Sequence, residues 1–397
     1  MEHFVKRLTV FAFTALFAGC AMAQDFNESP PNGQDQTPAF DGQTRAPVLP
    51  ARDLRRQVVV GGLEYPWGMA ELPDGSWLVT ERPGRLRMVS PDGKLSEPIE
   101  GLPPVDDRGQ GGLLDVIVDE DFAQTRRLWV AFSEIHQYEL SGTSVATGIL
   151  SEDGRRIDGL QVLWGQEPWN SNIHLGARLV LDNDGGLFVT TGERGEIERP
   201  PATQDVGSTI GKVVRVDPLT GDPMGATGIE GAIPELWSYG HRNVQGAALG
   251  PDGALWTIEH GPRGGDELNR PEAGKNYGWP LVTYGTNYDG TPVGDGLTQM
   301  EGIEQPVYYW DPIVAPSGMI FYDGEMFPDW QGDLLFGGLS TQSLVQLKIA
   351  DGRVIGEARH LWGEEGRIRD VDVARDGAIM LLIDAEDGAM IRVTPAD

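Results

Sequence analysis

The sequence predicts an all-β fold, a single six-bladed β-propeller over residues 52–397. Three observations support this prediction: a repeated turn-and-strand pattern, a composition rich in glycine and proline, and no linker-like stretch after residue 52. The chain has 54 Gly and 28 Pro in 397 residues, which suits many short strands joined by tight turns. Its hydrophobic fraction of 40% is sufficient for a substantial core.

The repeated pattern is an Asp-containing turn followed by an apolar strand, as in the LPDGSWLVT stretch of residues 72–80. Six copies occur, four clear and two weaker, at Asp74, Asp184, Asp252 and Asp376 and at Asp119 and Asp323. Their spacing of 45 to 71 residues is typical of propeller blades, which bury both faces by stacking in a ring. An open β-sandwich with coincidental turns is the alternative, but a sandwich of this length would need two domains. We expect the ring to close by pairing residues 57–60 with residues 390–393.

The N-terminus has the features of a signal peptide over residues 1–23. A basic start precedes an apolar run that is too short to span a bilayer comfortably, and an Ala-X-Ala cleavage pattern ends at Ala23. Cys20, the only cysteine, offers a second possibility, a lipid anchor. Both interpretations predict export across a bacterial inner membrane, so we expect a periplasmic or secreted protein.

Residues 24–51 are polar and rich in Pro, Gly, Gln and Asp, which predicts a disordered linker. The formal net charge of the whole chain is -29. Such a surface repels phosphate backbones and anionic lipid, so nucleic acid and anionic membranes are poor partners.

Loops from every blade of a propeller gather at one end of its axis, so polar clusters that are far apart in the sequence can meet there. The first cluster places Gln110 between glycines in residues 108–114. Glycine lets the backbone pass close to a flat ligand while the amide reaches it. The second contains His174, which could act as a general base near neutral pH. A tight turn and a structural histidine are the alternatives.

Two further clusters supply arginines. Arg242 beside Asn243 offers fixed donors for carboxylates or for a developing oxyanion. Arg367 and Arg369, two residues apart on a strand, point to the same face. A loop braced by its own hydrogen bonds and a surface charge pair are the structural alternatives.

The densest cluster covers residues 259–269 and 274–280. Its Gly and Pro residues expose backbone carbonyls, and Asp266 and Glu267 supply carboxylates, which together are the hard oxygen ligands that Ca²⁺ takes. A glycine-rich loop pinned by salt bridges is the alternative. Taken together, the clusters predict a pocket for a planar anion with several carboxylates.

With these clusters in this order, the chain resembles the soluble pyrroloquinoline quinone (PQQ)-dependent sugar dehydrogenases, which include glucose, sorbosone and aldose sugar dehydrogenases. The matching stretches are residues 109–114, the His174 segment, and residues 240–243, 259–269, 274–280, 314–318 and 367–370. The resemblance implies a six-bladed propeller that binds PQQ and Ca²⁺ at its axial mouth. It also implies oxidation of an aldose at the anomeric carbon to a lactone.

The resemblance further implies a role for each matching residue. His174 would take the proton of the anomeric hydroxyl, and Arg242 would polarise the quinone carbonyl that receives the hydride. The residues that would hold PQQ or wall the cleft beside it are Gln110, Asn243, Arg367, Arg369, Tyr308 and Trp310. The carbonyls of Gly261 and Pro262 would bind the Ca²⁺ beside PQQ. Glu267 and the Tyr277 carbonyl would bind a second, structural Ca²⁺.

Two positions depart from the family pattern. Ser340 stands near the place of a lysine that often contacts the cofactor, and Ile313 replaces an expected small hydroxyl residue. Two other functions stay open: a calcium-dependent hydrolase such as a lactonase, which would not need the paired arginines, and a non-catalytic sugar-binding propeller, which would explain the two departures. We expect selectivity for the sugar to lie in loops at residues 141–147 and 286–296.

Overall fold

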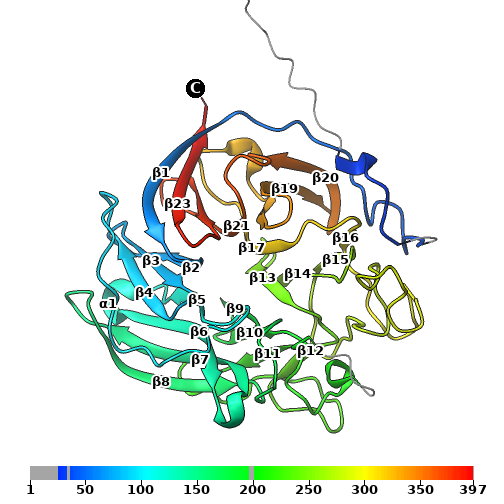
Figure 1. Ribbon diagram of the computed structural model, residues 1–397, viewed down its shortest axis with the longest axis horizontal. Coiled ribbons are helices and arrows are strands. Elements are labelled where there is room, and N and C mark those ends of the chain that lie inside the picture. The colour runs from blue at the N-terminus through cyan, green and yellow to red at the C-terminus, as the bar shows by residue number, and fades with distance from the viewer. Residues whose placement is uncertain (1–25, 34–35, 196–200, 397) are drawn as a thin grey trace, which may run out of the picture.

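A computed structural model describes residues 26–33, 36–195 and 201–396 of the chain. Six sheets surround a central axis, which confirms the predicted six-bladed β-propeller (Figure 1). The helical elements within these ranges are one short α-helix and four 3-10 turns, namely α1 (Phe122–Thr125), η1 (Phe26–Glu28), η2 (Gln137–Glu139), η3 (Ala202–Gln204) and η4 (Pro328–Trp330). In the same ranges, no helix is long and apolar enough to cross a membrane.

The first blade has three strands and each of the other five has four. In order from blade 1 to blade 6 the strands are β2 (Pro66–Glu71), β3 (Trp77–Glu81), β4 (Arg85–Val89); β5 (Leu113–Val118), β6 (Arg127–Ile135), β7 (Ser141–Leu150), β8 (Ile157–Gly165); β9 (Gly176–Leu181), β10 (Leu187–Thr191), β11 (Lys212–Val216), β12 (Leu236–Tyr239); β13 (Val244–Leu249), β14 (Leu255–Glu259), β15 (Asp266–Asn269), β16 (Tyr308–Trp310); β17 (Pro316–Phe321), β18 (Leu334–Gly338), β19 (Ser343–Ala350), β20 (Arg353–His360); and β21 (Ile368–Val373), β22 (Ile379–Ile383), β23 (Gly388–Pro395), β1 (Leu54–Leu63).

Each predicted Asp turn joins the innermost strand of a blade to the second strand. In blade 1, for example, the Asp74 carboxylate accepts the Ser76 N–H at 2.9 Å, and Gly75 supplies the left-handed residue of the turn at φ 81°. The repeat thus marks one hairpin per blade. The turn of this hairpin lies at one end of the blade, and the inner strand begins at the other end.

The ring closes as the sequence predicts. The N-terminal strand β1 pairs antiparallel with the C-terminal strand β23, and the register aligns Gln57 with Arg392 and Val60 with Met390. Figure 1 shows the two strands side by side in the last blade. The ends of the domain therefore hold one blade together, and β23 is not left as a free sheet edge.

The core is divided into six hydrophobic clusters, one at each interface between neighbouring blades. Strand β22 shows how a single strand serves two of them. Ile379 and Leu381 pack toward blade 5, while Met380 and Leu382 pack toward blade 1. Side chains on a strand alternate between its faces, so a continuous apolar run is what a blade buried on both faces requires.

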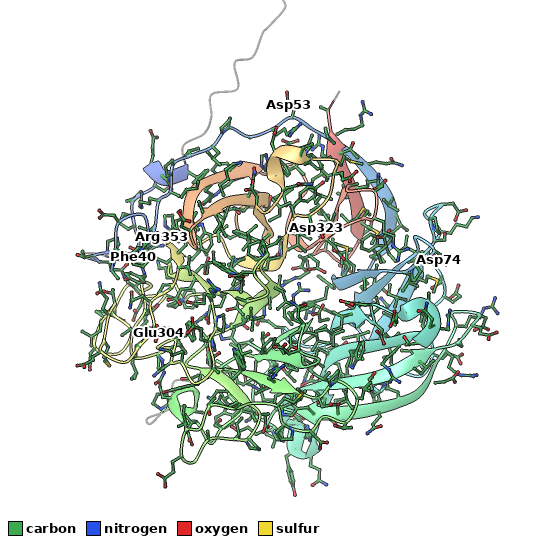
Figure 2. The ribbon with its side chains drawn as sticks, turned by 180° about the vertical axis from the view of Figure 1, so that it is seen from behind. Phe40, Asp53, Asp74, Glu304, Asp323 and Arg353 are labelled. Atoms are coloured by element: carbon green, nitrogen blue, oxygen red, sulfur yellow. The ribbon has the colours of Figure 1, made fainter. Side chains whose placement is uncertain are left out.

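The N-terminal segment differs from the disordered linker expected for residues 24–51. Within the described part of that segment, Gln43 and Ala46 are fully buried, and the Gln43 side chain donates to the Pro306 carbonyl at 2.9 Å. Phe40 lies under the Arg353 guanidinium at 4.3 Å, and Figure 2 shows the two side by side. A few well-placed contacts with blades 4 and 5 order this polar stretch, which its composition did not indicate.

Candidate functional site

A cavity on the propeller axis brings the predicted clusters together. The innermost strands β2, β5, β9, β13, β17 and β21 surround the axis, each in contact with the inner strands of its two neighbours (Figure 1). All six blades contribute to the wall of the cavity, through Trp67, Arg82, Gln110, Leu114, Leu175, Gly176, Asn243, Gln245, His260, Leu339, Arg367, Arg369 and Asp384. Four of the predicted site residues are among them: Gln110, Asn243, Arg367 and Arg369.

The cavity wall carries three arginines and one carboxylate. Arg369 is buried and donates to Asp384 at 2.9 Å and to Gln245 at 3.1 Å, while its Nε has no partner among the described residues. The more exposed Arg367 donates to the same carboxylate oxygen at 3.1 Å. Burial alone would raise the pKa of Asp384, but the two arginines lower it. The wall therefore keeps an excess of positive charge, which suits an anionic ligand.

Gln110 contacts the second cluster directly. Its side-chain oxygen accepts the backbone N–H of His174 at 2.8 Å. The neighbouring Gly112 has φ 133°, and a Cβ there would lie 2.1 Å from the Arg82 carbonyl oxygen. This glycine thus lets the loop pack closely against the neighbouring backbone.

His174 is held by a carboxylate that the sequence reasoning did not identify. Its Nδ1–H donates to Glu193 Oε1 at 2.5 Å, and its side chain is 12% exposed. No described residue hydrogen-bonds its Nε2. Burial lowers the pKa of His174, and the bond to Glu193 opposes that shift. The imidazole is therefore neutral near pH 7, with a lone pair on Nε2 that can accept a proton.

Glu193 lies between the two residues predicted to be catalytic. Its Oε1 is 4.0 Å from Arg242 Nε, and both Glu193 Oε2 and Arg242 Nε are buried without a partner in the described structure. Close packing sets this geometry, since a Cβ on Gly192 would lie 2.0 Å from the His174 carbonyl oxygen. Only glycine fits there, and Glu193 follows it immediately.

The Arg242 guanidinium is fixed on two further sides. Its Nη1 donates to the Gly261 carbonyl at 2.7 Å and to the His260 carbonyl at 3.1 Å. The guanidinium also lies 5.1 Å from the ring centroid of Trp279. Asn243, the next residue, lines the cavity and accepts the Gln245 side-chain N–H at 3.2 Å.

The loop predicted to bind the first calcium is anchored by Asp266. The Asp266 carboxylate accepts the N–H groups of Gly261, Val314 and Ala315 at 2.7–2.9 Å. It is therefore a structural brace, and burial raises its pKa to about 6. Gly261 and Pro262 are both buried in this loop, and the Gly261 carbonyl faces Arg242.

Glu267 and Tyr277 contact the two ends of a polar chain made of Asn269, Glu259 and His241. Asn269 donates to Glu259 and to Glu267, each at 3.1 Å, and its own Oδ1 is buried without a partner in the described structure. Burial and the neighbouring Glu259 carboxylate raise the pKa of Glu267 well above its ordinary value. The Tyr277 ring stacks on His241 at 4.9 Å. Carboxylates that pair with no Lys or Arg in the described structure, together with an amide oxygen that accepts no hydrogen bond, are a donor set suited to a hard cation. No group of three or more His, Cys, Asp or Glu side chains with metal-site geometry occurs among the described residues.

The structure does not bring Tyr308 and Trp310 to the axial cavity. Both are buried in the core between blades 4 and 5 and line a separate cavity beneath the N-terminal segment, together with Ile313. Ser340 is exposed. Of the two loops expected to select the sugar, one is not a loop: residues 141–147 belong to the buried strand β7. Residues 286–296 form a loop as expected.

Sequence reasoning missed Glu193, Arg82 and Asp384. Each follows the second strand of its blade: Arg82 follows β3, Glu193 follows β10 and Asp384 follows β22. These positions lie at the open end of the hairpin whose turn the repeat marks. They are on the face of the propeller that carries the cavity. Searching for polar residues directly after each predicted second strand would have found all three.

Comparisons with known proteins agree with this geometry. The family model for glucose/sorbosone dehydrogenases matches residues 63–392. The aldose sugar dehydrogenase YliI of Escherichia coli is 41% identical over 345 residues, which cover 85% of this chain and 92% of that protein. A crystal structure of the soluble aldose sugar dehydrogenase from Escherichia coli in its apo form is 40% identical, covers 87% of this chain and all of that chain, and superposes with a TM-score of 0.82. A PQQ-bound aldose sugar dehydrogenase from Streptomyces coelicolor is 27% identical, with the same coverage and a TM-score of 0.70.

Proposed function

The chain belongs to the glucose/sorbosone dehydrogenase family, and on that premise we propose that it oxidises an aldose sugar at its anomeric carbon to a lactone, with PQQ and Ca²⁺ as cofactors. One observation carries the proposal. A neutral His174, paired with Glu193, and a buried Arg242 converge beside an axial cavity walled by arginines from two blades.

The residues present fit PQQ, a flat quinone with three carboxylates. Arg82, Arg367 and Arg369 supply positive charge, and the buried Nε of Arg369 lacks a partner among the described residues. Apolar side chains, Leu175 and Leu339 among them, offer surfaces against which a planar ring can lie. When bound, PQQ would accept the hydride of the sugar. The Streptomyces coelicolor relative is described as PQQ-bound, which supports the assignment.

The protein's own contribution begins with a proton. His174 Nε2 would accept the proton of the anomeric hydroxyl, and Glu193 would stabilise the imidazolium that forms. Arg242, held by two carbonyls and by Trp279, would place its positive charge where negative charge develops on the electrophile. Since Glu193 approaches both side chains, it would keep the base and the cation at a constant separation.

We place the two calcium ions at the sites that the sequence indicated. The carbonyls of Gly261 and Pro262 would hold the ion next to the cofactor, in the loop braced by Asp266. Glu267, together with the orphaned Asn269 Oδ1 and the Tyr277 carbonyl, would hold the structural ion. We also propose a periplasmic or secreted location, because the sequence predicts a signal peptide over residues 1–23, which lie outside the described residues.

Reconstitution tests the function. The apo protein is mixed with PQQ and Ca²⁺, and reduction of an artificial electron-accepting dye is followed with a panel of aldoses. We expect reduction that requires both cofactors and disappears in the His174→Gln variant. Lactone hydrolysis without dye reduction would favour the hydrolase, and the absence of both activities would favour a non-catalytic sugar-binding propeller.

A further inference from the structure

Lys212 is the buried exception among the lysines of the described chain. Lys94, Lys275 and Lys348 have side chains that are 80%, 47% and 41% exposed, whereas Lys212 is 0% exposed. No carboxylate in the described ranges lies within ion-pair distance of its Nζ; Asp205 and Glu167 act on it only through space. A buried cation without a paired anion requires another form of compensation.

Backbone carbonyls supply this compensation. The Lys212 ammonium donates to the carbonyls of Ala202 and Thr203, each at 3.0 Å, and to that of Ile210 at 2.5 Å. An ammonium group has three N–H donors, so all three are satisfied. The first two carbonyls begin the loop 202–210 and the third ends it, so the single cation closes the loop on itself.

The closed loop supports the wall behind Arg242. Thr203 Oγ1 and Gln204 Nε2 both donate to the Trp279 carbonyl at 2.8 Å. The Thr203 carbonyl also accepts the Gly240 N–H at 3.1 Å, and the Trp279 N–H donates to the Gly240 carbonyl at 2.8 Å. The Trp279 ring lies 5.1 Å from the Arg242 guanidinium. A continuous path of contacts therefore runs from Lys212 through the loop and Trp279 to Arg242.

We propose that Lys212 is a positioning residue for Arg242: its ammonium group occupies a carbonyl cage of the kind that binds a monovalent cation, and thereby fixes the loop that holds Trp279 against the guanidinium. The role of Arg242 in catalysis rests on the proposed function, but the mechanical link from Lys212 to Trp279 does not. Carbonyl oxygens also coordinate K⁺, so an added cation should be able to take the place of the ammonium group in a variant that lacks it.

Hydrogen–deuterium exchange of the apo protein tests the link without any cofactor. The measurement is made at pH 6, because burial lowers the pKa of Lys212 to about 7 and the charged form must predominate. In Lys212→Met, we expect exchange of residues 202–211 and 276–282 to become about tenfold faster or more. The matched control, Lys94→Met in an exposed turn, should leave both segments unchanged. Unchanged exchange of residues 276–282 in Lys212→Met would overturn the proposal.

Chemical rescue tests the cage itself. Lys212→Ala removes three methylenes and the ammonium group, which propylammonium replaces atom for atom. We expect propylammonium or K⁺ to restore slow exchange, and tetramethylammonium, which is too large, to have no effect. Failure of both cations to restore slow exchange would contradict the proposal.

Two more measurements keep the outcome decisive. If Lys212→Met does not fold, the Thr203→Val variant serves instead, because it removes one hydrogen bond to the Trp279 carbonyl and keeps the cage. Exchange should become faster in residues 276–282 but not in residues 202–211. The opposite pattern would count against the link.

In the PQQ-loaded enzyme, Lys212→Met should lower kcat about tenfold or more, with KM for the sugar little changed. If the wild-type enzyme reduces no dye, the proposed function fails while the exchange result stands.

Discussion

Two histidine–glutamate pairs occupy equivalent positions in neighbouring blades. In blade 3, His174 precedes the inner strand β9 and pairs with Glu193, which follows β10, at 2.5 Å. In blade 4, His241 precedes the inner strand β13 and pairs with Glu259, the last residue of β14, at 2.9 Å. The second pair is thus a structural copy of the first, one blade further around the ring.

The two pairs differ in what remains free. His241 is 0% exposed, and its Nε2 lies 2.8 Å from Ser238 Oγ, so both ring nitrogens are engaged. Glu259 is also engaged, because it accepts the Arg242 N–H at 2.6 Å. His174, by contrast, has one nitrogen without a partner in the described structure. A histidine–carboxylate pair can therefore exchange a proton with a ligand only where its second ring nitrogen is free.

The largest expected effect separates the two histidines by activity. His174→Gln should lower kcat about 1000-fold, since it removes the proton acceptor. Its melting temperature should stay within about 1 °C of the wild-type value, because the glutamine amide still offers Glu193 a hydrogen-bond donor. Steady-state dye reduction and thermal unfolding measure the two quantities. Full turnover in this variant would show that another group is the base.

His241→Ala should have the opposite profile. It removes the buried partner of Ser238, one of the partners of Glu259 and a ring stacked on Tyr277, so we expect a loss of about 3 kcal/mol in the free energy of unfolding. Urea unfolding of the apo protein measures the loss. A variant as stable as the wild type would mean that the two pairs differ less than their contacts indicate.

Glu193→Gln should alter the pH profile and not the fold. Only neutral His174 can accept a proton, so activity falls as the pH drops through its pKa. Because Glu193 raises that pKa, its removal should move the acid limb of kcat/KM to lower pH. The maximal rate should fall about 20-fold, since the imidazolium loses its stabilising charge. An acid limb that moves to higher pH would reverse the assigned sign.

The structural calcium proposed at Glu267 should stabilise the side of the molecule that carries His241. Glu259 of that pair contacts Asn269, beside Glu267, so a cation there should stabilise the fold. At ten times its dissociation constant, Ca²⁺ adds about 1.4 kcal/mol, or about 2 °C. Addition of a chelator should reverse the shift, and Glu267→Gln should abolish it. An equal shift in Glu267→Gln would place the ion elsewhere.

Much of the fold was predictable because its signals are local. An Asp-Gly turn and the apolar strand that follows it depend on neighbouring residues, so spacing alone indicated six blades and the pairing of residues 57–60 with 390–393. The residues Gln110, Asn243, Arg367 and Arg369 were also identified, since each stands in a distinctive cluster, and they meet at the axis. Tyr308 and Trp310 were expected beside the cofactor, but the core between blades 4 and 5 contains them.

The sequence by itself therefore determined the number of blades and the position of each hairpin, because turn chemistry and strand periodicity act over a few residues. Only the tertiary structure decided which polar residues share a site. Glu193 reaches both His174 and Arg242 because blades 3 and 4 lie side by side, and the described part of residues 24–51 is ordered by contacts with blades 4 and 5. Such relations join positions far apart in the chain, and no local pattern encodes them.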